Sequence, residues 1–330
     1  MPAPSSQTLQ RLAQSTGHQA GTLEKVLRLL DLLQEIAGDP LLSGRLALKG
    51  GTALNVFHLG LDRLSVDIDL NYIGALDRAE MEANRPAIDA AIDRLLVSQG
   101  YSIRRRPEEH AGGKWIARYA SALGGSAALE IDVNYMARQP LFGAAMMDSM
   151  KLAELQAKNV LVLDPHEIVA GKLVALFDRH AARDLFDARR ILSIEGLDWS
   201  RIKAAVLAIG ATGRRDWRAV SIESIKGDPQ ELRQKLAICL PHGYFAGAGK
   251  VDAWIAETIA LCRERLGFLF DLTAGEQEFL DRILDKGEVN ATLLNVDAEL
   301  ARRIEAMPML AWKCQHVRKM YGLGEPQPAS

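Results

Sequence analysis

The sequence predicts an α+β protein, with a mixed β-sheet in the N-terminal half and helices in the C-terminal half. Three observations favour this class. Residues 45–73 read as a strand, a glycine turn, a helix and a second strand. Residues 101–136 hold three strand-like segments separated by glycine-containing turns, which is the pattern of an antiparallel meander. After Asp164 strand-like runs are scarce, and amphipathic helical stretches follow one another.

Length and composition set the frame for this fold. The 330 residues fit two domains at roughly 100 to 200 residues each, and we expect a sheet-based core over residues 1–160 and a helical domain over residues 161–330. A formal net charge of -2 neither requires nor excludes nucleic acid. The three cysteines form no zinc-binding pattern, and the sequence contains neither a signal peptide nor a membrane-spanning run. The cytoplasm is therefore the expected location.

The first elements follow from periodicity. Residues 22–38 repeat leucine and valine on one helical stripe, which predicts an amphipathic helix with Thr22 as its N-cap. Residues 45–51 predict a short strand that ends in a glycine turn, and residues 52–61 predict a helix. Residues 65–73 alternate apolar and polar side chains and therefore predict a strand.

The remaining elements of the sheet half are a helix and the meander. Residues 77–98 predict a long helix that is interrupted near Pro86, because proline has no N–H to donate. Gly112 and Gly113 are expected in the first turn of the meander. The strands of the meander are expected over residues 101–107, 114–121 and 127–136.

Two aspartates stand one residue apart in the apolar strand 65–73. Strand alternation places Asp67 and Asp69 on one face, with backbones about 7 Å apart. Two close carboxylates in a buried strand repel each other unless a cation or basic side chains compensate them, so the pair indicates a divalent-metal site. The simpler alternative is a solvent-facing strand with ordinary surface acids. Glu130 and Asp132 share a face of a later strand, and a third carboxylate from there would suit metal-assisted phosphoryl transfer.

A glycine pair precedes the two aspartates. Gly50, Gly51 and Thr52 connect a strand to a helix, and such a turn exposes backbone N–H groups that bind phosphate oxygens. Glycine pairs alone are weak signals, because most of them make tight turns. The combination with a D-x-D strand about 16 residues later favours a nucleotide-phosphate site.

These motifs resemble the DNA polymerase beta type nucleotidyltransferase superfamily. They resemble the AbiEii/AbiGii toxin family, which includes the MenT toxins, more closely still. The resemblance is carried by LKGGTALNVFHLGLDRLSVDIDL, IDVNY, GKLVALFDRHAARDLFD and MPMLAWK, and it covers roughly residues 23 to 320. It implies a polymerase-beta-type nucleotidyltransferase core followed by a largely helical C-terminal domain. It also implies an NTP substrate, Mg²⁺ or Mn²⁺ as cofactor, and a cognate antitoxin encoded nearby.

The same resemblance implies roles for the motif residues. The glycine turn of Gly50, Gly51 and Thr52 would hold the triphosphate, and the D-x-D pair would ligate the metal. Asp132 matches the third acidic position better than Glu130 does, and it is expected to join the pair as a catalytic acid and a metal ligand. Residues that precede the D-x-D strand, Arg63 and Ser65, are expected to position the strand or to contact phosphate.

A helix in the C-terminal half carries the basic part of the resemblance. Lys172 would neutralise the NTP phosphates, and Arg179, on the same helical stripe, would join it. Asp184 in R-D-x-x-D would be a functional acid that orients Lys172 or contacts the nucleotide. Asp187 is expected to cap the helix or to pair with Arg183 or Arg190. The structural alternative is that these charged side chains form an ion network on helix surfaces.

The expected function is that of a Mg²⁺-dependent nucleotidyltransferase toxin. Members of the family with known activity transfer a nucleotide from an NTP, and MenT-like members add pyrimidines to the tRNA 3′ end, which blocks aminoacylation and inhibits growth. We therefore expect an RNA acceptor, with tRNA favoured. The alternatives are transfer to a protein or small molecule, and a non-catalytic module that binds nucleotide or RNA.

Two stretches are candidate RNA-binding surfaces. Arg104, Lys114, Trp115 and Arg118 combine basic and aromatic side chains on the meander, although an exposed sheet edge explains them equally well. Residues 201–235 contain eight Lys or Arg against four acids. In the motif MPMLAW, Met309 and Trp312 are expected in the core.

Overall fold

A seven-stranded mixed sheet forms the centre of the N-terminal half. The computed structural model describes residues 4–107, 112–179, 181–247 and 249–324. The strand order is β3-β4-β5-β2-β1-β7-β6, in which β2 and β5 are parallel, as are β1 and β7, while the other neighbours are antiparallel. The strands are β1 Leu46–Lys49, β2 Asp67–Tyr72, β3 Ser102–Pro107, β4 Gly112–Ala120, β5 Ser126–Asn134, β6 Ala144–Met147 and β7 Val160–Leu163.

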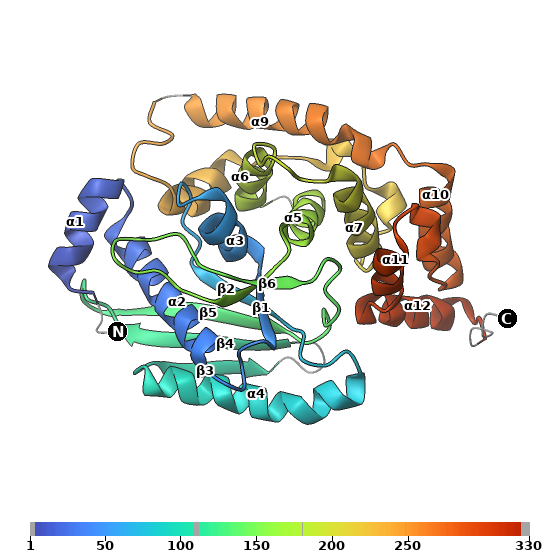
Figure 1. Cartoon of the computed structure of the whole chain (residues 1–330). Helices are drawn as coiled ribbons and strands as arrows, with labels where there is room; N and C mark the ends of the chain where they lie inside the picture. Colours follow the sequence, from blue (N-terminus) through green and yellow to red (C-terminus); the bar gives the residue numbers. More distant parts are fainter. Residues whose placement is uncertain (1–3, 108–111, 180, 248, 325–330) are drawn as a thin grey trace.

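Helices flank the sheet and make up the C-terminal half. In Figure 1, α4 runs along the edge at β3, whereas α5, α6 and α7 lie on the opposite side of the molecule beneath α9. The helices are α1 Ser6–Thr16, α2 Ala20–Gly38, α3 Gly50–Ala53, α4 Arg78–Ser98, α5 Pro165–Arg179, α6 Ala182–Ile191, α7 Trp199–Ala211, α8 Pro229–Glu231, α9 Lys250–Leu266, α10 Ala274–Asp281, α11 Ala298–Glu305 and α12 Pro308–Tyr321.

The two faces of β2 have different surroundings. Leu70 faces α2, where it lines a small gap together with Leu33 and Ile36. Asp69 and Asn71, on the other face, line a cavity toward α5 and α12. The alternation of the strand therefore separates an apolar face, which holds the sheet against α2, from a polar face, which is open to the helical half.

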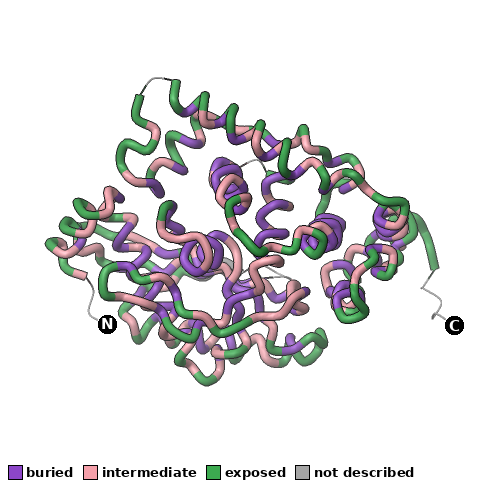
Figure 2. Tube along the Cα trace, turned by 45° about the horizontal axis from the view of Figure 1, so that its top comes forward, coloured by how far each residue is buried: buried purple, intermediate pink, exposed green. Residues whose placement is uncertain are grey.

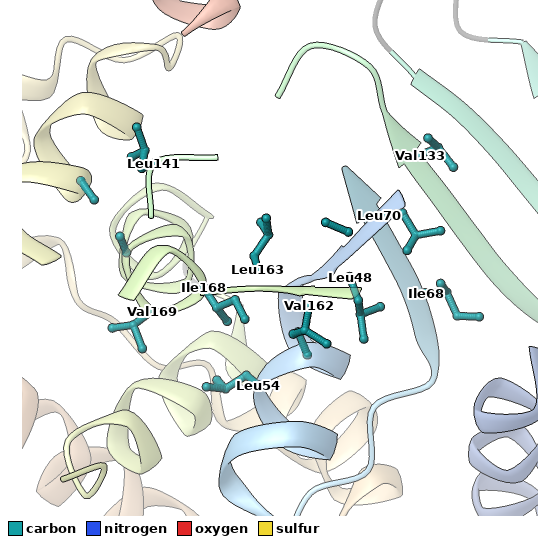
Figure 3. Packing of buried hydrophobic residues seen from close by; sticks show 14 of the residues in the cluster. Leu48, Leu54, Ile68, Leu70, Val133, Leu141, Val162, Leu163, Ile168 and Val169 are labelled. Atoms are coloured by element: carbon teal, nitrogen blue, oxygen red, sulfur yellow. The ribbon is translucent and has the colours of Figure 1, made fainter. Parts of the chain in front are cut away.

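One hydrophobic cluster joins the sheet to the helices. It contains Leu48, Leu70 and Val162 from the strands and Ile168 and Val169 from α5, and Figure 3 shows these side chains gathered between the strands and the helices. The same cluster extends to α12. In Figure 2 the buried segments are concentrated inside the molecule, and the outer helices carry exposed stretches. This shared core fixes the position of α5 relative to the sheet. The division of the chain at residue 160 stays a prediction.

The predicted elements occur in the predicted order with local differences, whereas α1, β6 and β7 were not predicted. The helix after β1 begins at Gly50 rather than at residue 52, and it continues as a π-helical segment over Leu54–Leu59. Helix α2 begins at Ala20, so Thr22 is inside it; the Thr22 hydroxyl donates a hydrogen bond to the carbonyl of Ile238 instead of capping the helix. Gly112 and Gly113 belong to β4 rather than to the turn before it.

The predicted interruption at Pro86 is wrong. Helix α4 is continuous from Arg78 to Ser98 with Pro86 inside it. The proline stands in the third turn, whereas Asp77 caps the N-terminus of the helix by accepting from the N–H of Glu80. Contacts of α4 with the sheet, through buried residues such as Ile88 and Ile92, outweigh the loss of one helical hydrogen bond.

A membrane-spanning role for these helices finds no support in their composition. Within the described parts of the chain, none of the helices combines the length and the apolar character that crossing a bilayer requires.

Candidate functional site

Four carboxylates line one face of the sheet where β2 and β5 run side by side. The parallel register places Asp67 beside Glu130, and it places Asp69 beside Asp132. All four residues line a polar cavity of about 230 Å³. Strand alternation and the parallel register together bring about this arrangement, so the predicted shared face of Asp67 and Asp69 is observed.

The glycine turn lies directly against the second aspartate. Gly50 has a φ of +72°, a conformation that favours glycine. A Cβ added to Gly50 would lie 2.5 Å from Oδ2 of Asp69, and one added to Gly51 would lie 3.4 Å from Nζ of Lys172. The absence of side chains at these two positions therefore lets a carboxylate and an ammonium group approach the backbone of the turn. The turn, the D-x-D strand and the helix α5 meet at one place.

Thr52, the third residue of the predicted phosphate-binding turn, does not line the site. Its side chain is fully buried, and its hydroxyl donates a hydrogen bond to the backbone carbonyl of Asp67. Thr52 thus ties the helix after the glycine turn to the start of β2. It holds the strand that carries the aspartates and is not among the residues that line the cavities.

A second, larger cavity of about 350 Å³ adjoins the polar one. The two share the residues Gly51, Asp69, Lys172 and Arg179, so they form two lobes of one site. The larger lobe has an apolar part and an amide-rich part. Its apolar lining comes from Met136, Ala137, Leu163, Ile168, Ile209, Met307 and Met309, and its amide lining comes from Asn71, Asn134 and Gln139.

Lys172 is held at the junction of the lobes by two buried carboxylates. Its Nζ is 2.8 Å from Oδ2 of Asp187 and 3.5 Å from Oδ1 of Asp184. Asp187 also accepts two hydrogen bonds from the guanidinium of Arg63, at 2.9 and 3.0 Å. Asn55 donates to Asp187 and to the carbonyl of Gly51, which links the ion network to the glycine turn.

The expectation for Asp187 is therefore wrong. Asp187 pairs with Arg63 and Lys172, not with Arg183 or Arg190, and its side chain is fully buried. Burial by itself would raise the pKa of Asp187, but the charges of Arg63 and Lys172 outweigh it and hold this pKa at about 2. Arg63 is itself 1% exposed, yet it is among the residues that line the polar cavity.

Asp184 was expected to orient Lys172, but Arg179 is its nearer partner. It accepts two hydrogen bonds from Arg179, at 2.6 and 2.9 Å, and is only within 3.5 Å of Lys172. The Arg179 side chain is 59% exposed and lines both lobes, and its hydrogen bonds with Asp184 raise its pKa. Arg183, which the sequence did not single out for the site, lies 3.3 Å from Oδ2 of Asp67. Ser65 lines the polar lobe.

The residues present fit a divalent cation that arrives with a phosphate ligand. Among the described residues, no three side chains of His, Cys, Asp or Glu are grouped closely enough to hold a metal ion. Mg²⁺ commonly binds through one or two protein carboxylates and completes its shell with phosphate oxygens and water. Asp67 and Asp69 supply such a pair, and the glycine turn and Lys172 adjoin them. Glu130 is already in an ion pair with Lys114, at 2.7 Å.

Several cavity residues were missed from the sequence. Glu167, Asn71 and Gly171 all line the larger lobe. Asn71 could have been found by alternation, because it follows Asp69 by two residues on the same strand face. Gly171 precedes Lys172 directly, but neither it nor Glu167 has a motif of its own.

Two expectations for aromatic and sulfur side chains change. Met309 lines the larger lobe, and Trp312 is 54% exposed and stacks on His316, so Trp312 is not a core residue. Trp115 is fully buried and donates to Asp93, which removes it as a stacking platform for RNA.

The basic stretch 201–235 is partly neutralised by acids from elsewhere. Arg218 pairs with Asp281 and Asp285 of the C-terminal helices in addition to Asp216. Lys203 pairs with Glu276. The local excess of positive charge is therefore smaller in space than in sequence, and an RNA-facing role for this stretch stays a prediction.

Enzymes that transfer nucleotides from NTPs need a phosphate seat next to a carboxylate pair that can hold a divalent cation. The fold and the two-lobed site define this class, the nucleotidyltransferases. Residues 31–249 match the family described as nucleotidyl transferase AbiEii toxin of type IV toxin–antitoxin systems, and the chain belongs to this family. It is therefore a nucleotidyltransferase of a toxin family, and the predicted resemblance is confirmed.

The chain is similar to two solved structures, of which one shows the fold. MenT4, a nucleotidyltransferase toxin from Mycobacterium tuberculosis H37Rv, aligns with a TM-score of 0.57 at 17% sequence identity, over 92% of this chain and 97% of that chain. JHP933 from Helicobacter pylori aligns with a TM-score of 0.45 at 17% identity, over 76% of this chain and 94% of that chain. A comparison with curated protein sequences finds no match. The likeness to MenT4 shows the α+β fold, as predicted.

Proposed function

We propose that this chain transfers a nucleoside monophosphate from an NTP to a hydroxyl group of RNA, with the tRNA 3′ end as acceptor and Mg²⁺ or Mn²⁺ as cofactor. One observation carries the proposal: Asp67 and Asp69 share a strand face that adjoins Gly50, Gly51 and Lys172. In such a site the carboxylates can hold a divalent cation on one side of a phosphate group, and the lysine places its positive charge on the other side. Modification of tRNA would inhibit translation in the cytoplasm.

Each part of the site has a role in this reaction. The backbone of Gly50 and Gly51 and the Nζ of Lys172 bind the triphosphate, and Arg179 screens its outer charge. Asp67 and Asp69 hold the cation. When bound, the cation draws charge from the transferring and leaving phosphates.

The protein side chains orient the reaction. The acceptor hydroxyl oxygen forms a bond to the α-phosphorus, the bond from that phosphorus to the bridging oxygen breaks, and pyrophosphate leaves with the electron pair. Asp132, beside Asp69 in the sheet, orients the hydroxyl and accepts its proton. Lys172 stabilises the charge on the leaving pyrophosphate, and Asp187 holds the lysine in place.

The test is incubation of the purified chain and magnesium with total RNA and each of the four α-labelled NTPs in turn, followed by a denaturing gel. We expect label in the tRNA band with at least one NTP. Label on a protein or small molecule instead of RNA would identify a different acceptor. NTP binding without any transfer would indicate a non-catalytic module. As a member of a toxin–antitoxin family, the chain should lose its toxicity when the antitoxin encoded nearby is co-expressed.

Gly50→Ala should lower the transfer rate by more than tenfold. The new methyl group would meet the carboxylate of Asp69, whose displacement misplaces the cation. Gly44→Ala is a matched control, because Gly44 has a φ of +75° but nothing within 4 Å of its added Cβ. Both variants should lose about 1–2 kcal/mol of unfolding free energy through left-handed backbone strain, measured by urea denaturation. Equal transfer rates in the two variants would contradict the role of the turn.

A further inference from the structure

The inner face of α5 lines the site from one end to the other. Its cavity-lining residues are Glu167, Ile168, Gly171, Lys172, Ala175 and Arg179. Lys172 and Arg179 belong to the polar lobe as well, whereas Glu167 belongs to the larger lobe alone. Glu167 precedes Lys172 by five positions, which is about 7.5 Å along a helix. A ligand with its phosphates at Lys172 therefore extends over Gly171 toward Glu167.

Gly171 leaves the path between these two residues open. A Cβ added at Gly171 would have nothing within 4 Å. The apolar walls of the larger lobe, which include Met307 and Met309, lie around this path. A sugar can pass over the glycine, and a flat base can pack against the methionine side chains.

Glu167 presents one oxygen to this lobe. Its Oε2 accepts hydrogen bonds from the backbone N–H groups of Leu141, at 2.7 Å, and Phe142, at 3.4 Å. Within the described chain, Oε1 has no hydrogen-bond donor. Burial raises the pKa of Glu167 to about 7, so a substantial share of the side chain is ionised at neutral pH.

Two of the other polar side chains of the lobe use a donor within the protein itself. The amide of Gln139 donates to Pro140, and the hydroxyl of Thr212 donates to Ile209. Oδ1 of Asn71 is buried and has no hydrogen-bond partner in the described structure. A ligand that brings N–H donors into this lobe therefore satisfies groups that the protein leaves unpaired.

We propose that Glu167 contacts the edge of the nucleobase and determines which base the enzyme prefers. The preferred NTP has an exocyclic amino group at a position where the disfavoured base has a carbonyl oxygen. Cytosine is then preferred over uracil, or adenine over hypoxanthine. The proposal rests on the proposed function, which places the triphosphate at Lys172. A carboxylate oxygen accepts from an amino group and repels a carbonyl oxygen at the same position. Glu167 is then a specificity-determining residue.

Two pairs of nucleotides differ by this group. CTP and ATP carry the amino group, and UTP and ITP carry an oxo group in its place. Rates of label transfer and binding constants from isothermal titration should be measured for all four with the full chain. We expect the wild type to prefer the amino member of the pair that it uses by roughly tenfold, because the oxo member leaves an acceptor facing an acceptor.

Glu167→Gln supplies the decisive variant. The two backbone N–H groups of Leu141 and Phe142 require an acceptor, so the glutamine carbonyl takes the place of Oε2 and its NH₂ group faces the lobe. The preference should therefore fall by at least tenfold or turn toward UTP and ITP. Glu305→Gln is the matched control, since Glu305 also accepts a backbone N–H, from Ala291, but does not line the site. The control should keep the wild-type ratios.

A second pair of variants tests whether the nucleotide passes over Gly171. Gly171→Ala should leave NTP binding within about twofold of wild type, and Gly171→Leu should weaken it for all four nucleotides without lowering the melting temperature.

Equal rates and affinities for the amino and oxo nucleotides in the wild type, or unchanged ratios in Glu167→Gln, would overturn the proposal while transfer to RNA still stood. Loss of transfer with all NTPs would instead defeat the proposed function, and the binding ratios alone would then decide the role of Glu167. If Glu167→Gln does not fold, the wild-type ratios decide it.

Discussion

Replacing both strand aspartates, Asp67→Asn with Asp69→Asn, is expected to lower nucleotide transfer by at least roughly a thousandfold. Asparagine keeps the shape of each side chain but removes the two negative charges that hold a divalent cation. The fold should survive, because the change removes two like charges from one strand face and the Asp67 side chain is 38% exposed. The measurement is label transfer from an α-labelled NTP to RNA, with urea unfolding on the same samples.

The control for this variant is a surface aspartate in an ion pair. Asp252 is exposed and lies 3.4 Å from Arg233, so Asp252→Asn removes one charge at a distance from the site. It should leave the transfer rate within about twofold and the unfolding free energy within about 1 kcal/mol. Binding of Mn²⁺ in the presence of NTP, followed by electron paramagnetic resonance, should be lost in the double variant only. Transfer that survives in the double variant would mean that the chemistry lies elsewhere.

The strand side of the site was predictable from the sequence because local rules determine it. Alternation alone places Asp67 and Asp69 on one face, and a glycine pair between a strand and a helix indicates a turn with a free backbone. The parallel pairing of β2 with β5, which brings Asp132 beside Asp69, is a tertiary fact that no local pattern indicates, and the resemblance supplied only Asp132 as the third acid.

The helix side of the site was predicted less well, because long-range packing determines it. Arg63 and Asp187 are far apart in sequence, and no local pattern marks them as partners. On a helical wheel Asp187 was a surface acid, and only the packing of α6 against α5 and α9 buries it completely. Glu167 looked like an ordinary acid in the first turn of α5, where acids are common. Its role depends on Leu141 and Met307, which reach it from other elements.

Replacing the buried aspartate under the lysine, Asp187→Asn, is expected to lower the free energy of unfolding by about 3–5 kcal/mol. The variant leaves Arg63 and Lys172 as buried cations facing a neutral amide. Transfer should also fall, because Lys172 is released from its 2.8 Å contact with the carboxylate. Replacing Arg63 and Asp187 together, by Met and Leu, should cost less stability than the single change, because no unpaired guanidinium remains. A loss below about 1 kcal/mol in the single variant would contradict this role.

Unfolding at acidic pH measures how much the carboxylate of Asp187 contributes to stability. In the folded chain the pKa of Asp187 is held at about 2, below its ordinary value of 3.8. A carboxylate with a depressed folded pKa stabilises the fold fully above its unfolded pKa, and the stabilisation is lost as pH falls through the folded pKa. The free energy of unfolding of the wild type should therefore fall by about 2 kcal/mol more than that of Asp187→Asn between pH 5 and pH 2. Urea unfolding at several pH values measures this difference, and Asp252→Asn, which changes an exposed ion pair, should follow the wild-type curve. Parallel curves for wild type and Asp187→Asn would mean that Arg63 and Lys172 do not hold the charge of Asp187 in the folded chain.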